Sequence, residues 1–149
     1  MATPKTRSVS HQYFVRAPPS RVFRAISTPA GLTRWLADYA EMPRRRGGTY
    51  VLGWRDGPKH TGRILGLVPG RSLTFEWAWP GIDLKGTRLR LSVQPTRGGS
   101  ILRVEHTGFP RQSRWVELYA GAEWGWTYFA MNLKSVLETG RDLRSSVDG

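Results

Sequence analysis

The chain has 149 residues, of which 39% are apolar and seven are tryptophan, which suffices for one globular domain with a real core and argues against disorder. It carries 23 basic and 11 acidic residues, a net charge of +12, and no cysteine, which excludes disulfides and thiolate chemistry. No window approaches the roughly 18 apolar residues of a membrane span, and the N-terminus lacks the apolar core of a signal peptide. We therefore expect a cytoplasmic protein with no integral membrane association.

The first expected elements are a strand and two short helices. Apolar and polar residues alternate over Ser8–Arg16, which predicts the strand. Val22 and Ile26 share one face of a helix of about two turns. Thr28 is a suitable N-cap for the second helix, with Pro29 at its first position.

The middle of the chain predicts antiparallel strands joined by tight turns. Alternating residues mark strands at 50–52, His60–Val68, Arg71–Trp79, Thr87–Pro95 and Gly99–Thr107. Gly47-Gly48 is interpreted as a turn at positive φ, and Asp56-Gly57 as a hairpin turn. Such alternation is typical of an antiparallel sheet with one solvated face.

A long amphipathic helix is expected from Ser113 to about Arg144, with a stop near Gly140. Its apolar stripe consists of Trp115, Leu118, Ala122, Trp126, Phe129, Leu133 and Val136. A helix with this stripe, laid across a sheet with an aromatic face, predicts an apolar cleft between the two.

Short segments spread from the first strand to the last helix form an ordered pattern. They are Ala17–Phe23, Thr28-Pro29, Leu32 with Trp35-Leu36, Gly47–Tyr50, Gly62 to Trp77, His106–Phe109, and Gly125-Trp126 with Leu133 and Leu137. In this order they resemble the START-like SRPBCC superfamily, and within it the branch related to the activator of the heat-shock protein 90 ATPase. The resemblance covers about residues 8–140.

The resemblance implies an α+β helix-grip fold, in which a curved antiparallel sheet wraps around a long C-terminal helix and two short helices follow the first strand. We expect a disordered lead over 1–7, one SRPBCC/START-like domain over 8–144 and a flexible tail over 145–149. Related groups hold lipids, sterols, polyketides or plant hormones in a cavity between sheet and helix, and a few are enzymes. The eukaryotic chaperone activator has an additional N-terminal domain, which this chain lacks, and this argues against a chaperone partner.

The residues expected to line the cavity are Trp35, Trp77, Trp79, Leu89, Leu91, Val104, His106, Trp126 and Phe129. His106 shares a strand face with Leu102 and Val104, so it is the one candidate for acid/base chemistry or for binding a polar head group. The alternative is a histidine at the edge of the core, satisfied by the backbone. Trp54 and Trp124 have no assigned role.

The remaining polar residues point to no further site. Glu76, Glu105 and Glu123 are expected at the surface, whereas Asp38 and Glu41 are placed near the mouth of the cavity. No carboxylates accompany the other two histidines, His11 and His60, at metal-ligand spacing, so no metal or cofactor is expected.

These patterns predict a protein that binds a hydrophobic or amphipathic small molecule in the cavity, rather than an enzyme. One alternative is a cyclase- or hydratase-type enzyme that uses His106 together with a second polar group in hydrogen-bond reach. Another is a chaperone- or nucleic-acid-interaction module. The arginines are scattered apart from Arg44-Arg45-Arg46, which favours no specific nucleic-acid binding.

Overall fold

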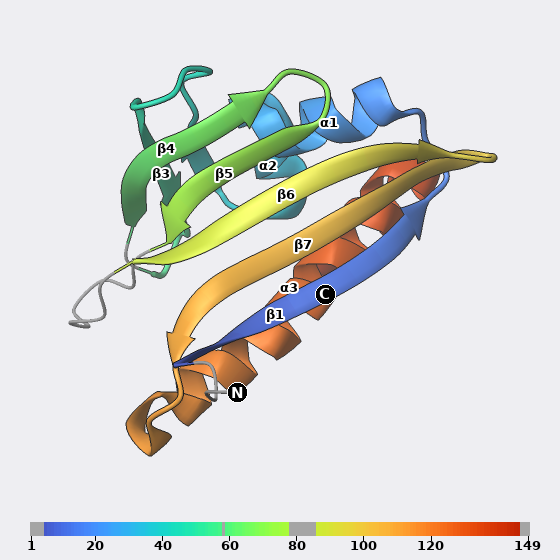
Figure 1. Cartoon of the computed structure of the whole chain (residues 1–149). Coiled ribbons are helices and arrows are strands. Elements are labelled where there is room, and N and C mark those ends of the chain that lie inside the picture. The colour runs from blue at the N-terminus through green and yellow to red at the C-terminus, as the bar shows by residue number, and fades with distance from the viewer. Residues whose placement is uncertain (1–4, 58, 78–85, 147–149) are drawn as a thin grey trace.

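The computed structural model describes residues 5–57, 59–77 and 86–146 and shows one sheet with one long helix across it (Figure 1). The strands are β1 (Thr6–Val15), β2 (Tyr39–Glu41), β3 (Thr49–Gly53), β4 (His60–Val68), β5 (Ser72–Trp77), β6 (Thr87–Thr96) and β7 (Gly99–Pro110). The helical elements are α1 (Pro19–Ser27), α2 (Pro29–Trp35), α3 (Val116–Thr139) and two short turns, η1 (Ser113–Trp115) and η2 (Leu143–Ser146).

The sheet is antiparallel and has the strand order β1-β7-β6-β5-β4-β3-β2. Consecutive strands from β2 to β7 are neighbours, and β1 joins the free edge of β7. Register shifts in the β1–β7 and β4–β5 pairs mark irregularities of the kind that bend a sheet. In Figure 1, α3 runs behind β7 and β1, while α1 and α2 lie behind the other strands. The expected helix-grip fold is confirmed.

The alternation in β6 and β7 separates a buried face from a solvated one. Leu89 and Leu91 of β6 have no exposed surface, and they pair in register with His106 and Val104 of β7. Arg90 of β6 is exposed on the other face. The sheet therefore presents one continuous apolar face to the helices.

The two short helices form a fixed pair. The Thr28 side chain caps α2 by accepting a hydrogen bond from the backbone N–H of Gly31 at 3.0 Å, with Pro29 in the first turn, as the sequence predicts. The buried indole of Trp35 donates to the carbonyl oxygen of Ala25 at 2.8 Å, which ties α2 to α1.

The last helix is shorter than predicted. The segment Ser113–Trp115 forms η1, and α3 begins only at Val116. It ends at Thr139 because Gly140 adopts φ 78°, a left-handed cap that glycine favours, and this confirms the predicted stop. No helix in the described ranges is long and apolar enough to cross a membrane.

The chain after α3 folds back onto α2. Asn132, fully buried in α3, donates to the carbonyl oxygen of Trp35 at 2.9 Å. Arg144 donates to the carbonyl oxygens of Ala37 at 3.0 Å and Thr33 at 2.8 Å. These bonds fix the C-terminal end of α3 against the short helices.

Two further differences concern strand boundaries. The short strand β2 was not anticipated, and β1 begins at Thr6, inside the expected lead, because Thr6 and Arg7 pair with β7. The predicted strand Arg71–Trp79 is observed as β5, and Trp79 lies outside the described residues.

Candidate functional site

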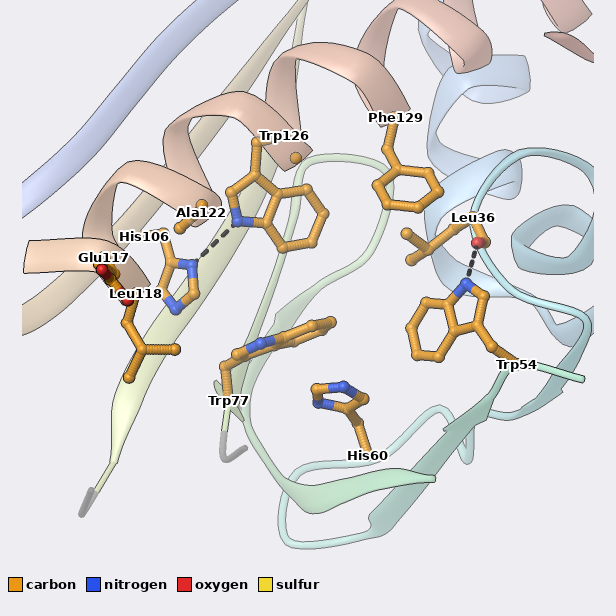
Figure 2. A pocket seen from close by; sticks show the side chains of 12 residues that line it. Leu36, Trp54, His60, Trp77, His106, Glu117, Leu118, Ala122, Trp126 and Phe129 are labelled. Atoms are coloured by element: carbon orange, nitrogen blue, oxygen red, sulfur yellow. Dashed lines mark hydrogen bonds between the residues drawn. The ribbon is translucent and has the colours of Figure 1, made fainter. Parts of the chain in front are cut away.

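A cavity of about 400 Å³ lies between α3 and the β3–β5 part of the sheet (Figure 2). Its wall is mainly aromatic and aliphatic, and Glu117 is its one acidic residue. The lining residues are Leu36, Trp54, His60, Trp77, His106, Glu117, Leu118, Gly121, Ala122, Gly125, Trp126 and Phe129.

Aromatic rings make up most of this wall. Trp77 contacts Trp126 edge-to-face, with ring centroids 5.3 Å apart, and it contacts His60 at 4.9 Å. The ring of Trp54 meets His60 edge-on at 5.3 Å. Figure 2 shows these rings and Phe129 arranged around the open space, with α3 on one side and Trp77 and His60 on the other.

A directed chain of hydrogen bonds fixes one end of the wall. The indole N–H of Trp126 donates to Nδ1 of His106 at 2.9 Å. Because an indole can only donate, Nδ1 must be the acceptor, and the ring proton lies on Nε2. Nε2 donates to the hydroxyl of Thr87 at 2.8 Å, and that hydroxyl donates to the carbonyl oxygen of Trp77 at 2.7 Å.

This chain determines the chemical state of His106. The residue has no exposed surface, and burial lowers its pKa to about 3. Both ring nitrogens are engaged by side chains, and a proton on Nδ1 would oppose the indole N–H. His106 is therefore neutral near pH 7 and holds the ring of Trp126 in place, which does not suit a group that exchanges protons with a substrate.

The structure brings together four of the residues expected on the cavity wall, namely Trp77, His106, Trp126 and Phe129. The other described residues of that set lie elsewhere. Leu89, Leu91 and Val104 are on the correct sheet face but are not on the cavity wall, since other core residues cover them completely. Trp35 borders a smaller hollow between α1, α2 and the C-terminal half of α3.

Sequence reasoning missed Trp54 and His60. Both continue the alternation of buried residues. Trp54 follows Tyr50 and Leu52 at two-residue spacing, and His60 has the same parity as buried Ile64. The indole N–H of Trp54 donates to the carbonyl oxygen of Leu36 at 2.8 Å, so this ring is fixed as well.

Two glycines of α3 were also missed as part of the wall. Gly121 and Gly125 lie one helical turn apart, and neither has a positive φ. A Cβ atom added to either would meet nothing within 4 Å. Glycine inside a helix costs about 0.5–1 kcal/mol relative to alanine. Neither backbone conformation nor packing requires glycine here, and its effect is to leave space in the cavity.

The remaining polar candidates are not among the residues that line this wall. Asp38 accepts a hydrogen bond from the backbone N–H of Arg55 at 2.7 Å, and Glu41 is exposed on β2. Glu123, expected to be exposed, is half-buried with an oxygen 3.2 Å from Nε2 of His11. No group of three His, Asp or Glu side chains in the described part of the chain is placed to hold a metal ion.

A curved antiparallel sheet closed by a C-terminal helix, with an apolar cleft between them, defines a helix-grip protein of the SRPBCC superfamily. The chain belongs to the family described as activator of Hsp90 ATPase homolog 1-like proteins, whose family profile matches residues 16–138.

Solved structures from several bacteria share this fold. A protein of Mesorhizobium loti superposes with a TM-score of 0.81 at 23% identity, over 91% of this chain and 99% of that one. The Aha1 dimer of Colwellia psychrerythraea gives 0.79 at 19% identity, over 91% and 98%. DynU16, from the dynemicin biosynthetic locus, gives 0.80 at 21% identity, over 91% and 48%. No curated protein matches the chain at a significant level.

Proposed function

We propose that this protein binds a hydrophobic or amphipathic small molecule in the cavity between α3 and the sheet. The observation that carries the proposal is that the rings of Trp54, Trp77, Trp126 and Phe129 border an open volume of about 400 Å³ instead of filling it. Ligand sites have volumes of roughly 300–1,000 Å³ and walls of this composition.

The driving force for binding is apolar burial. Each 100 Å² of apolar surface removed from water contributes about 2.5 kcal/mol, before the cost of immobilising the ligand. Since the indole groups of Trp54 and Trp126 are held by hydrogen bonds, little side-chain freedom is lost when a ligand enters. Glu117 would orient an amphipathic ligand with its polar group toward that carboxylate.

The comparisons support this proposal at the level of the fold. DynU16 comes from a biosynthetic locus, a setting in which proteins handle small organic molecules. The enzyme alternative gains no support from His106, because its two ring nitrogens are committed to Trp126 and Thr87. A cytoplasmic location and the absence of a specific nucleic-acid partner remain part of the proposal.

Placing a charge in the wall should weaken ligand binding without unfolding the domain. Leu118→Asp replaces a half-buried lining residue, so we expect the affinity for the fluorescent probe 1-aminoanthracene to fall more than about tenfold, because an apolar ligand cannot compensate a buried carboxylate. Val68→Asp makes the same change at an apolar residue that is 51% exposed and outside the cavity, and should leave the affinity unchanged. Equal affinities in the two variants would place the probe elsewhere on the protein.

A further inference from the structure

The solvated face of the sheet carries a second hollow, of about 410 Å³, lined by residues of β5, β6, β7 and the turn before β5. Among them, Arg90 and Ser92 of β6 alternate with the buried residues Leu89 and Leu91, so their side chains point away from the helices. This face is toward the viewer in Figure 1, where the α-helices lie behind the strands. The hollow is therefore separated from the cavity by the sheet itself.

Ser92 lies at the centre of a ring of hydrogen-bond donors. Along β6, the side chains two positions away on the same face are those of Arg90 and Gln94. Across the strands, Ser92 is in register with Ser72 of β5 on one side and with Arg103 of β7 on the other. All five residues line the hollow. Because serine is short and arginine is long, the two hydroxyl groups form a recessed floor inside a basic rim.

The two hydroxyl groups of the floor are not used within the protein. Ser72 is only 6% exposed, and neither its hydroxyl nor that of Ser92 has a hydrogen-bond partner in the described part of the chain. The side-chain amide of Gln94 has no partner there either. Since buried polar groups in proteins are nearly always paired, these donors favour a ligand rich in acceptor oxygens.

The charge of the hollow favours an anion. The guanidinium groups of Arg71 and Arg103 have no acceptor among the residues that the structure describes. Arg90 contacts Glu105 at 3.5 Å, which is longer than the roughly 2.7–2.9 Å of a charge-assisted hydrogen bond. Three arginines beside one carboxylate leave two positive charges in excess. A phosphate monoester, with a charge of about −1.5 to −2 near pH 7, balances that excess.

We infer that this hollow binds the phosphate group of a small phosphate monoester. The three arginines pair with the phosphate oxygens, and the two serine hydroxyls donate to them. The hollow is larger than a phosphate group, and Pro95 and Ile101 at its edge offer apolar surface to the organic part of the ligand. This site goes beyond the proposed function and does not depend on it, because it lies on the opposite face of the sheet.

The test titrates the full chain with phenyl phosphate by calorimetry at pH 7 and about 150 mM salt, where long-range attraction is screened. Arg103→Gln should weaken binding about tenfold, because one charge-assisted contact is lost. Arg45→Gln removes the same charge from an exposed residue outside the hollow, and should leave the affinity unchanged within about twofold.

A second pair of variants leaves the net charge unchanged. Ser92→Ala should weaken phenyl phosphate about fivefold, because one hydrogen-bond donor of the floor is lost. Ser10→Ala makes the same change at an exposed residue of β1 outside the hollow, and should have no effect. All four replaced side chains lie at the surface of the domain, so the Tm of each variant should stay close to that of the wild type.

Two related probes identify the ligand class. Methyl phenyl phosphate keeps the ring but is a monoanionic diester, as in nucleic acids and phospholipids, and should bind about tenfold more weakly. Inorganic phosphate should also bind more weakly, because it has no organic part. A diester or inorganic phosphate that binds as tightly as phenyl phosphate would overturn the assignment to a monoester. No binding of phenyl phosphate, or equal losses in Arg103→Gln and Arg45→Gln, would show that the hollow is not an anion site.

Discussion

Acidification from pH 7 to pH 4 is expected to remove about 3 kcal/mol of folding stability through His106 alone. Burial lowers its pKa from the ordinary 6.5 to about 3 in the folded state. As the pH falls below 6.5, His106 binds a proton in the unfolded chain but stays neutral in the folded chain. The free energy of unfolding therefore decreases until the pH reaches about 3.

His106→Gln is the matched control for this effect. A glutamine amide oxygen can accept from Trp126 and its amide nitrogen can donate to Thr87, but the group does not titrate. One acidic group also has a shifted pKa in the folded state. Hydrogen bonding by the Arg144 side chain lowers the pKa of Asp142 to about 2. That carboxylate destabilises both variants equally below about pH 4.

The measurement is urea denaturation from pH 7 to pH 4, followed by circular dichroism. The wild type should lose stability steeply below pH 6.5, and His106→Gln should follow a flatter curve. Identical pH profiles would show that His106 is protonated in the folded state as easily as in the unfolded state, which contradicts the hydrogen-bond chain.

Removal of residues 113–149, which include α3, is expected to abolish cooperative folding. Trp126 and Leu133 are buried in the core, and Asn132 and Arg144 donate hydrogen bonds to backbone carbonyl oxygens of α2. Without them the apolar face of the sheet would be open to water, and the loss of a single buried large side chain already costs about 2–5 kcal/mol.

The truncated chain should be aggregated, or compact without fixed tertiary packing, with a weak near-ultraviolet circular dichroism signal and a broad profile in size-exclusion chromatography. Met131→Ala, at a side chain of α3 that is 42% exposed, should leave both signals unchanged. A monodisperse truncation with a sharp unfolding transition would show that the sheet does not need the helix.

The sequence predicted those parts of the fold that depend on local periodicity. Alternation identified the inward face of β6 and β7, and helical spacing identified Leu118, Ala122, Trp126 and Phe129. Alternation does not give the distance from a strand residue to the helix. Leu89 therefore had the same expected role as Trp77, although it lies within the packed core.

The rest of the site depends on contacts between distant parts of the chain. Trp54 and His60 reach the cavity because the β3–β4 hairpin brings Trp54 against His60 and His60 against Trp77, and their parity alone did not indicate these contacts. The state of His106 depends on Trp126, twenty positions away on another element. The spacing of residues along the chain contains no information on that pairing.

The most direct test of ligand binding in this cavity follows the indole N–H signals in a two-dimensional ¹H–¹⁵N spectrum during titration with 1-aminoanthracene. The signals of Trp54, Trp77 and Trp126, assigned by single Trp→Phe variants, should shift and saturate together because all three line the cavity. Trp35, which is held by Ala25, and Trp124, which is 71% exposed, should not move. Shifts confined to Trp35 or Trp124, or no shift at saturating probe, would contradict the account.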